Sequence, residues 1–171
     1  MIFPSDPGAE PHAYFVTFCC YRRRRLLDHP RMRDIVAFIF AEKLTTFRAV
    51  CVGYVIMPDH VHSIVWLPET DLLSHFMKSW KQTSSLKLKR VMRGLLPNYA
   101  ARISSVDPFW QAKYFPFVLY SEQKAQDKLD YMHMNPVNAG LVTKAVDWKW
   151  SSARCYLLGE PVDVPVEWIF S

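Results

Sequence analysis

The chain has 171 residues and a net charge of +5, and half of its residues are hydrophobic. This composition excludes a globally disordered protein and supplies enough apolar surface for a folded core. The basic balance, with an isoelectric point near 9.1, favours an anionic partner without naming one. We expect one domain over residues 1–171, with an irregular arm over residues 1–11 that is rich in Pro, Gly and acids.

The sequence also predicts a compartment. No apolar run approaches the roughly 18 residues of a membrane span, and the first residues lack the basic start and apolar core of a signal peptide. The cysteines form no Cys-x-x-Cys pair and lie mostly in apolar contexts, which predicts buried free thiols; they are Cys19, Cys20, Cys51 and Cys155. We therefore expect a reduced, cytoplasmic protein with no membrane partner.

The first half of the chain reads as strand, helix, strand, strand. Residues 12–21 are aromatic and β-branched, which predicts a strand, and Pro30 then opens a helical pattern of apolar residues. Residues 47–56 and 60–67 predict two further strands. Met57-Pro58-Asp59 between them indicates a tight hairpin turn.

The second half returns to helical periodicity. Apolar residues recur every three or four positions over residues 71–95, and Trp80 lies on this stripe, which predicts that it belongs to the core. Residues 97–108 indicate a loop, and residues 110–120 contain a fourth strand. Ser121 is a typical N-cap of a helix that should run to about Asn135, where Pro136 should stop it. Short helices and turns should follow.

This order of elements predicts an α+β fold. A strand–helix–strand–strand–helix–strand–helix sequence is typical of a ferredoxin-like antiparallel sheet with helices packed on one face. The hairpin formed by residues 47–67 would then place the segment that begins at His60 inside the sheet.

His60 and His62 are the first candidate site residues. Side chains alternate faces along a strand, so both histidines point the same way, with Cα atoms roughly 6.6 Å apart. Two imidazoles at that separation can bind one divalent ion, although a catalytic metal site also needs a third ligand. The alternative is a pair of half-buried polar residues satisfied by their neighbours. Asp59 could be a ligand, a residue that orients a histidine, or only a turn residue.

Tyr131 and Asn135 form the second candidate pair. They are four residues apart on the last long helix, so they share one face, whereas His133 points elsewhere. Each has a purely structural alternative, since Tyr131 could be a core aromatic and Asn135 a helix terminator before Pro136.

The two pairs together resemble the single-tyrosine transposases of the HUH nuclease superfamily. The features in common follow one another in the expected order: the strand Tyr14–Phe18, His60-Val61-His62 on a central strand, Trp110-Gln111, Tyr131 and Trp150-Ser151-Ser152. The Asn135-Pro136-Val137 ending and the Trp-rich tail near Trp148 are most similar to the REP-associated tyrosine transposases. Mobile-element members often carry glutamine four residues after the tyrosine, where this chain has Asn135.

The resemblance implies a mechanism and a cofactor. Tyr131 would be the nucleophile that attacks single-stranded DNA near a hairpin, giving a 5′-phosphotyrosine link that can be rejoined. His60, His62 and Asn135 would bind Mg²⁺ or Mn²⁺. The protein would act as a transposase, as a monomer or homodimer. A replication-initiation or relaxase nuclease would share this chemistry, but those proteins commonly order the two motifs the other way or carry helicase domains.

Basic residues supply candidate DNA contacts. They are Arg22, Arg23, Arg24 and Arg25 after the first strand, and Lys78, Lys81, Lys87 and Arg90 on the helix over residues 71–95. In a nuclease, these residues would contact DNA phosphates. Such contacts position the protein on the DNA but do not read the base sequence. Alone, they equally suit a solvated surface. The same residues would serve the alternative function, a non-catalytic nucleic-acid-binding module on a ferredoxin-like sheet. Trp110, Gln111 and Lys113 could border the site or only pack.

Overall fold

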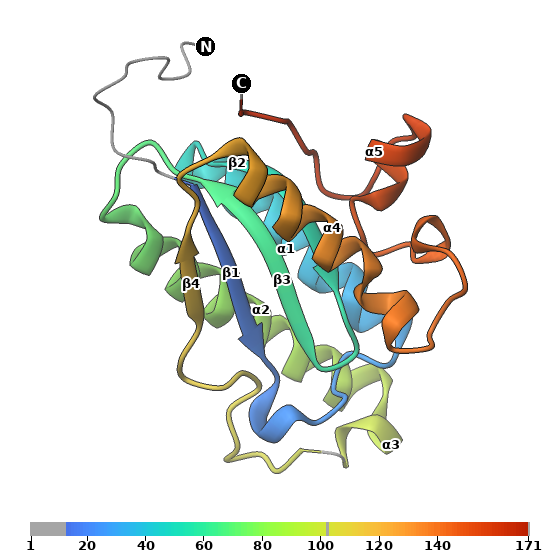
Figure 1. The fold of residues 1–171 in the computed structure, drawn as a ribbon. Helices are drawn as coiled ribbons and strands as arrows, with labels where there is room; N and C mark the ends of the chain where they lie inside the picture. The colour runs from blue at the N-terminus through green and yellow to red at the C-terminus, as the bar shows by residue number, and fades with distance from the viewer. Residues whose placement is uncertain (1–12, 102, 171) are drawn as a thin grey trace.

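A four-stranded antiparallel sheet organises the protein. The computed structural model describes residues 13–101 and 103–170, so the arm predicted over residues 1–11 lies outside the described residues. The strands are β1 (Ala13–Cys19), β2 (Val50–Ile56), β3 (His60–Trp66) and β4 (Phe115–Val118), in the spatial order β2-β3-β1-β4. The predicted α+β antiparallel sheet is confirmed, and the strand that carries His60 and His62 is one of its two central strands (Figure 1).

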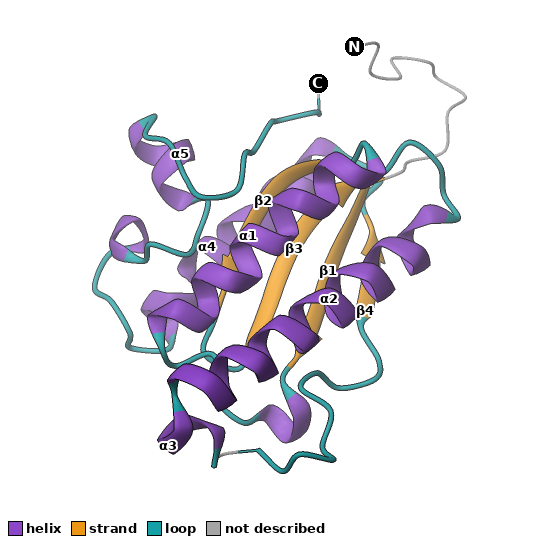
Figure 2. Cartoon of the chain, turned by 180° about the vertical axis from the view of Figure 1, so that it is seen from behind, coloured by secondary structure: helices purple, strands orange, loops and turns teal. Residues whose placement is uncertain are grey.

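The helices lie on both sides of this sheet. α1 (Pro30–Phe47) and α2 (Leu72–Leu95) pack on one face, whereas α4 (Glu122–Asn138) crosses the opposite face. Figure 1 shows α4 in front of the sheet, and Figure 2 shows α1 and α2 from behind. The short elements are η1 (Tyr21–Arg23), α3 (Pro97–Ala100), η2 (Ala145–Asp147) and α5 (Ala153–Leu158).

The expectation that the helices share one face was therefore wrong for α4. The strands themselves explain the arrangement, because β2 and β3 are buried along nearly their whole length rather than at alternate positions. Val61 and Val65 join the core beneath α1 and α2, while Ile64 joins the core beneath α4. A sheet that is apolar on both faces needs a covering layer on each.

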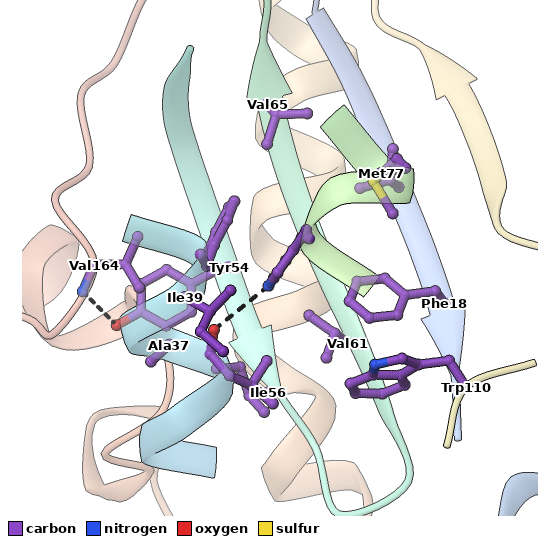
Figure 3. Close-up of a cluster of buried hydrophobic side chains, with 14 of the residues drawn as sticks. Phe18, Ala37, Ile39, Tyr54, Ile56, Val61, Val65, Met77, Trp110 and Val164 are labelled. Atoms are coloured by element: carbon purple, nitrogen blue, oxygen red, sulfur yellow. Dashed lines mark hydrogen bonds between the residues drawn. The ribbon is translucent and has the colours of Figure 1, made fainter. Parts of the chain in front are cut away.

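Aromatic rings fill the core between the sheet and α1 and α2. Trp80 is fully buried, as its place on the apolar stripe predicted, and its ring stacks on Phe40 with centroids 4.0 Å apart. Phe18 meets both Trp80 and Trp110 edge to face at 4.8 Å. Figure 3 shows this cluster, in which the Tyr54 hydroxyl also accepts a hydrogen bond from Val164 N–H at 3.4 Å. Aromatic pairs of this kind add to the free energy gained by burial.

The end of α4 differs from the prediction. Ser121 does cap the helix, accepting a hydrogen bond from Lys124 N–H at 3.3 Å, but Pro136 lies inside the helix and does not stop it. A proline removes one backbone hydrogen bond and crowds the carbonyl four residues earlier, and only two residues of α4 follow Pro136. The helix ends instead at Asn138, and Gly140 beyond it has a φ of +68° that suits a glycine, with Leu141 N–H donating to the Pro136 carbonyl at 2.9 Å.

The residues after α4 cover the outer edge of β2. Ile56 N–H donates to the Trp150 carbonyl at 2.8 Å, Ser152 N–H donates to the Tyr54 carbonyl at 3.0 Å, and Glu167 N–H donates to the Cys51 carbonyl at 2.9 Å. These bonds satisfy backbone groups that an edge strand would otherwise expose. The predicted short helices and turns thus pack on the body of the domain.

Two smaller expectations have clear outcomes. Cys19, Cys20 and Cys51 are buried free thiols, as predicted, and Cys155 is partly buried and also free. The loop expected over residues 97–108 contains the short helix α3. Every helix in the described ranges is too short or too polar to cross a membrane. The cytoplasmic location stays a prediction.

Candidate active site

The two histidines of β3 converge as their spacing predicted. His60 and His62 point to the face of the sheet that α4 covers, and their ring centroids lie 4.7 Å apart. Both side chains are largely buried. The rigid central strand fixes their separation, because β3 is hydrogen-bonded to β1 on one side and β2 on the other.

A carboxylate orients the first histidine. Nδ1 of His60 lies 2.7 Å from Asp59 Oδ1, and Asp59 Oδ2 lies 3.1 Å from Arg23 Nε. Burial raises the pKa of Asp59, but the hydrogen bond and charge of His60 and the charge of Arg23 outweigh this effect and hold the pKa below its usual range. An ionised carboxylate only accepts hydrogen bonds, so Nδ1 of His60 donates to Asp59, which leaves Nε2 as the ring nitrogen open to a ligand. This geometry favours the orienting role for Asp59.

A hydroxyl holds the second histidine. Thr17 lies directly opposite His62 in the β1–β3 register, and its Oγ1 is 2.7 Å from His62 Nδ1. Burial, followed by the charge of His60, lowers the pKa of His62 to about 3. The imidazole is therefore neutral at neutral pH, which is the form that binds metal ions. The Thr17 hydroxyl can donate or accept, and when it accepts from Nδ1, Nε2 of His62 is the second available lone pair.

Tyr131 lies beside this pair in the same chain. Its ring meets His62 edge to face with centroids 5.5 Å apart, and it meets Phe15 at 6.3 Å. The side chain is 51% exposed, so the structural alternative of a core aromatic is wrong. Asn135, one helical turn further along α4, is partly exposed. The helix thus presents both residues along one side, as their spacing predicted.

Tight packing sets the position of α4. Its residues Leu129 and Met132 are buried against the sheet, next to Gly53 of β2. A Cβ atom at Gly53 would lie 2.3 Å from Leu129 Cδ1 and 2.9 Å from Met132 Cε, which are impossible contacts. The absence of a side chain at Gly53 therefore allows α4, and with it Tyr131, to approach the sheet.

His133 helps to anchor α4 and does not line the candidate site. It is buried, and its Nε2 lies 2.7 Å from Ser152 Oγ. This pair resembles a nucleophile and its base, but Ser152 is fully buried and also accepts a hydrogen bond from Tyr54 N–H at 3.0 Å. The pair therefore ties α4 to β2 and to the segment that follows η2.

The donors available for a metal ion are few. Within residues 13–101 and 103–170, no three side chains among His, Cys, Asp and Glu gather in an arrangement that could hold a metal ion. A site built on His60 and His62 therefore needs a third donor of another type. The amide oxygen of Asn135 fits this need, because amide and carboxylate oxygens suit Mg²⁺ and Mn²⁺.

Comparison with known proteins decides the family. The family model described as "Transposase IS200 like" matches residues 10–135, a range that contains both histidines, Tyr131 and Asn135. The chain belongs to the IS200-like transposases. The predicted resemblance to tyrosine transposases is thereby confirmed.

Individual relatives of this IS200-like transposase point to one group. A REP-associated tyrosine transposase of Escherichia coli is 25% identical over 100 residues, which cover 58% of this chain and 52% of the relative. A Haemophilus influenzae protein assigned to the same group is 28% identical over 102 residues, which cover 59% of this chain and 57% of the relative. The chain thus matches only about half the length of these relatives.

A solved structure supports the fold. The REP-associated tyrosine transposase bound to a REP hairpin aligns with a TM-score of 0.69, covering 100% of this chain and 94% of that chain. The sequence identity is 18%, so this likeness concerns the fold alone.

The arginines after β1 lie at the histidine end of the sheet. Cys20 N–H donates to the Asp59 carbonyl at 2.8 Å, which joins this loop to the β2–β3 turn. Arg23 pairs with Asp59, Arg24 with Asp107 and Arg25 with Asp28. Arg22 is exposed, and both Arg22 and Arg23 adopt a left-handed backbone with φ near +55°. Non-glycine residues rarely adopt that conformation, which often marks functional loops.

The basic residues of α2 lie in the helical layer on the other face of the sheet (Figure 2). Lys78, Lys87 and Arg90 are exposed. Lys81 donates to the carbonyls of Gln111 and Ala112 at 2.8 Å, so it fixes the segment before β4. Trp110 packs in the core and donates to Ser84 Oγ at 3.0 Å. DNA contacts by the predicted basic residues stay a prediction.

Sequence reasoning missed several residues around Tyr131. Thr17 and Phe15 line the histidine face from β1, and alternation along that strand could have identified them once its pairing was known. Lys128 lies three residues before Tyr131, a spacing that places the two on one side of a helix. Its Nζ is 5.9 Å from the centre of the Tyr131 ring.

Proposed function

We propose that this protein is a transposase that cleaves and rejoins single-stranded DNA near hairpins through Tyr131. The observation that carries the proposal is the contact between the Tyr131 and His62 rings, 5.5 Å apart, within one chain. This contact supports a single site that combines the two motifs. A monomer can therefore supply the whole site, and the relative solved with a REP hairpin makes hairpin DNA the expected substrate class.

Tyr131 would form the covalent intermediate. Its Oη bonds to the phosphorus at the cleavage point, the bond from phosphorus to the 3′ oxygen breaks, and that oxygen takes up a proton as a free 3′-hydroxyl. The phenolic proton leaves to solvent, which the half-exposed side chain contacts. The 5′-phosphotyrosine link retains the energy of the broken phosphodiester, so a 3′-hydroxyl can reverse the step and rejoin DNA.

His60, His62 and Asn135 would hold Mg²⁺ or Mn²⁺. Each imidazole has Nδ1 engaged and would offer Nε2 as a ligand, and Asn135 would supply an oxygen. A bound ion would polarise a non-bridging oxygen of the scissile phosphate. Asp59, and Thr17 acting as an acceptor, would favour the tautomer that such binding requires.

A gel assay tests the proposal. A hairpin oligonucleotide from the DNA flanking the gene, with unpaired ends, is incubated with the protein and Mn²⁺, and covalent adducts are separated under denaturing conditions. Tyr131→Phe should abolish the adduct and leave binding intact, whereas Tyr120→Phe, at a 76% exposed tyrosine, should leave both unchanged. His60→Ala with His62→Ala should also abolish the adduct.

The outcomes separate the competing functions. An adduct that survives Tyr131→Phe would remove the tyrosine from the mechanism. Tight binding by the wild-type protein with no scission in any divalent metal would favour the non-catalytic nucleic-acid-binding module.

A further inference from the structure

The edge strand β4 leaves two phenylalanines uncovered beside the candidate active site. Phe115 and Phe117 are 60% and 46% exposed. They pair with Thr17 and Phe15 of β1, and directly paired residues share a face, so both phenylalanines lie on the face of His62 and Tyr131. α4 packs over β2 and β3 and leaves this edge open. Core packing therefore does not account for these rings.

A cation lies among the rings. Lys128 Nζ is 5.0 Å from the centre of the Phe15 ring, 5.1 Å from that of Phe117 and 5.9 Å from that of Tyr131. Lys128 forms no ion pair with any carboxylate of the described residues, so its charge is available to an incoming anion. The rings hold the ammonium in place by cation–π attraction.

We propose that Phe115 and Phe117 form a stacking platform for unpaired bases next to the scissile phosphate, and that Lys128 contacts the phosphate backbone between them and Tyr131. Flat rings beside a cation match the alternation of bases and phosphates in a single strand. The platform is also continuous with the nucleophile through Phe15 and Lys128. This inference rests on the proposed function, because it places the platform against the strand that Tyr131 attacks.

A second protein chain fits this edge less well. β4 has only four residues, and Pro116 lacks the N–H that a pairing strand would need. Short edges that contain proline are a common means of preventing strand addition. The exposed rings and the cation, not the backbone of β4, are therefore the recognition elements.

A binding assay tests the platform separately from cleavage. The probe is a twelve-nucleotide oligothymidylate that contains one 2-aminopurine, with EDTA present so that no cleavage occurs. Phe115→Leu and Phe117→Leu remove the aromatic face and keep much of the apolar bulk. We expect each to weaken binding by about ten-fold and to reduce the quenching of 2-aminopurine that stacking causes. Lys128→Gln should lower the salt dependence of binding by about one phosphate contact.

The controls make the result decisive. Phe38→Leu changes a phenylalanine that is 66% exposed on α1, on the other side of the sheet, and should bind as the wild type. Wild-type affinity and quenching in Phe115→Leu and Phe117→Leu would overturn the platform even if Tyr131 forms the DNA adduct. Conversely, weakened binding in both, with an adduct that survives Tyr131→Phe, would support the platform and overturn only the proposed chemistry.

Discussion

Replacing Gly53 by alanine should damage both stability and catalysis through one contact. The added Cβ would lie 2.3 Å from Leu129 Cδ1, 2.9 Å from Met132 Cε and 3.3 Å from Ser152 Oγ. Leu129 and Met132 flank Tyr131 in α4, and Ser152 ties α4 to β2 through His133. Gly53→Ala must therefore move α4 away from the sheet or force two core side chains out of their rotamers.

The size of the effect follows from core overpacking. Extra methyl groups in a packed core cost about 1–3 kcal/mol. In a domain of this size, each kcal/mol lowers the melting temperature by about 2–4 °C, so Gly53→Ala should melt roughly 2–12 °C below the wild type. A displacement of the nucleophile by about 1 Å can slow a reaction as much as 100-fold, so the rate of adduct formation should fall by at least about ten-fold.

Calorimetry measures the melting temperature, and single-turnover adduct formation measures the rate. Gly94→Ala is the matched control. A Cβ at Gly94, in α2, would meet no atom within 4 Å, so this change should leave the rate unchanged and the stability equal or slightly higher. A combined Gly53→Ala and Leu129→Val variant should show favourable coupling, because the shorter side chain removes the closest contact. Gly53→Ala with a wild-type melting temperature and rate would refute this account of how α4 is positioned.

Three further predictions test the surroundings of the site. Asp59→Asn removes the charge that keeps the proton on His60 Nδ1, so the affinity for Mn²⁺ measured by titration calorimetry should fall about 10–100-fold, and an unchanged affinity would contradict the orienting role. Burial lowers the pKa of His133 to about 4 in the folded protein. As the pH falls below about 6.5, the histidine of the unfolded chain therefore takes up a proton before the folded one does, and folding stability is lost between about pH 6.5 and pH 4. Between pH 7 and pH 5, the free energy of unfolding measured with urea should fall by about 2 kcal/mol more for the wild type than for His133→Gln. Equal losses in the two proteins would exclude His133 as the source. Arg22 lies at the histidine end of the sheet, so Arg22→Ala should lower the salt dependence of binding to single-stranded DNA. Lys87 lies in the helical layer on the other face, so Lys87→Ala should lower the salt dependence only of binding to a hairpin long enough to reach α2. The reverse pattern would contradict this path for the DNA.

Local sequence patterns predicted most of the elements and both halves of the site. Period-two alternation places His60 and His62 on one face, and helical spacing places Tyr131 and Asn135 on one side of α4. The apolar stripe that contains Trp80 likewise identified a buried face of α2. These predictions succeed because each depends on residues close together in the chain.

The placement of α4 required tertiary information. A helical stripe shows that a face is buried, but not which side of a sheet receives it. The signals were present in Gly53, where a Cβ would collide with Leu129 and Met132 of α4, and in the apolar positions on both faces of β3. Pro136 misled because the single hydrogen bond that it removes does not end α4, and the left-handed Gly140 follows where the helix does end.

Under the proposed function, the position of α4 would link stability, catalysis and access of DNA to Tyr131. Because the helix packs over β2 and β3, its buried residues are the contacts that set the distance from Tyr131 to His62, so changes that loosen the fold should also slow the chemistry. The same position leaves β4 open, with Phe115 and Phe117 exposed on the side from which a strand would reach Tyr131. A helix packed centrally over the sheet would cover that edge. Under the proposed function, the off-centre packing of α4 would therefore give Tyr131 a rigid support and a DNA strand an open approach.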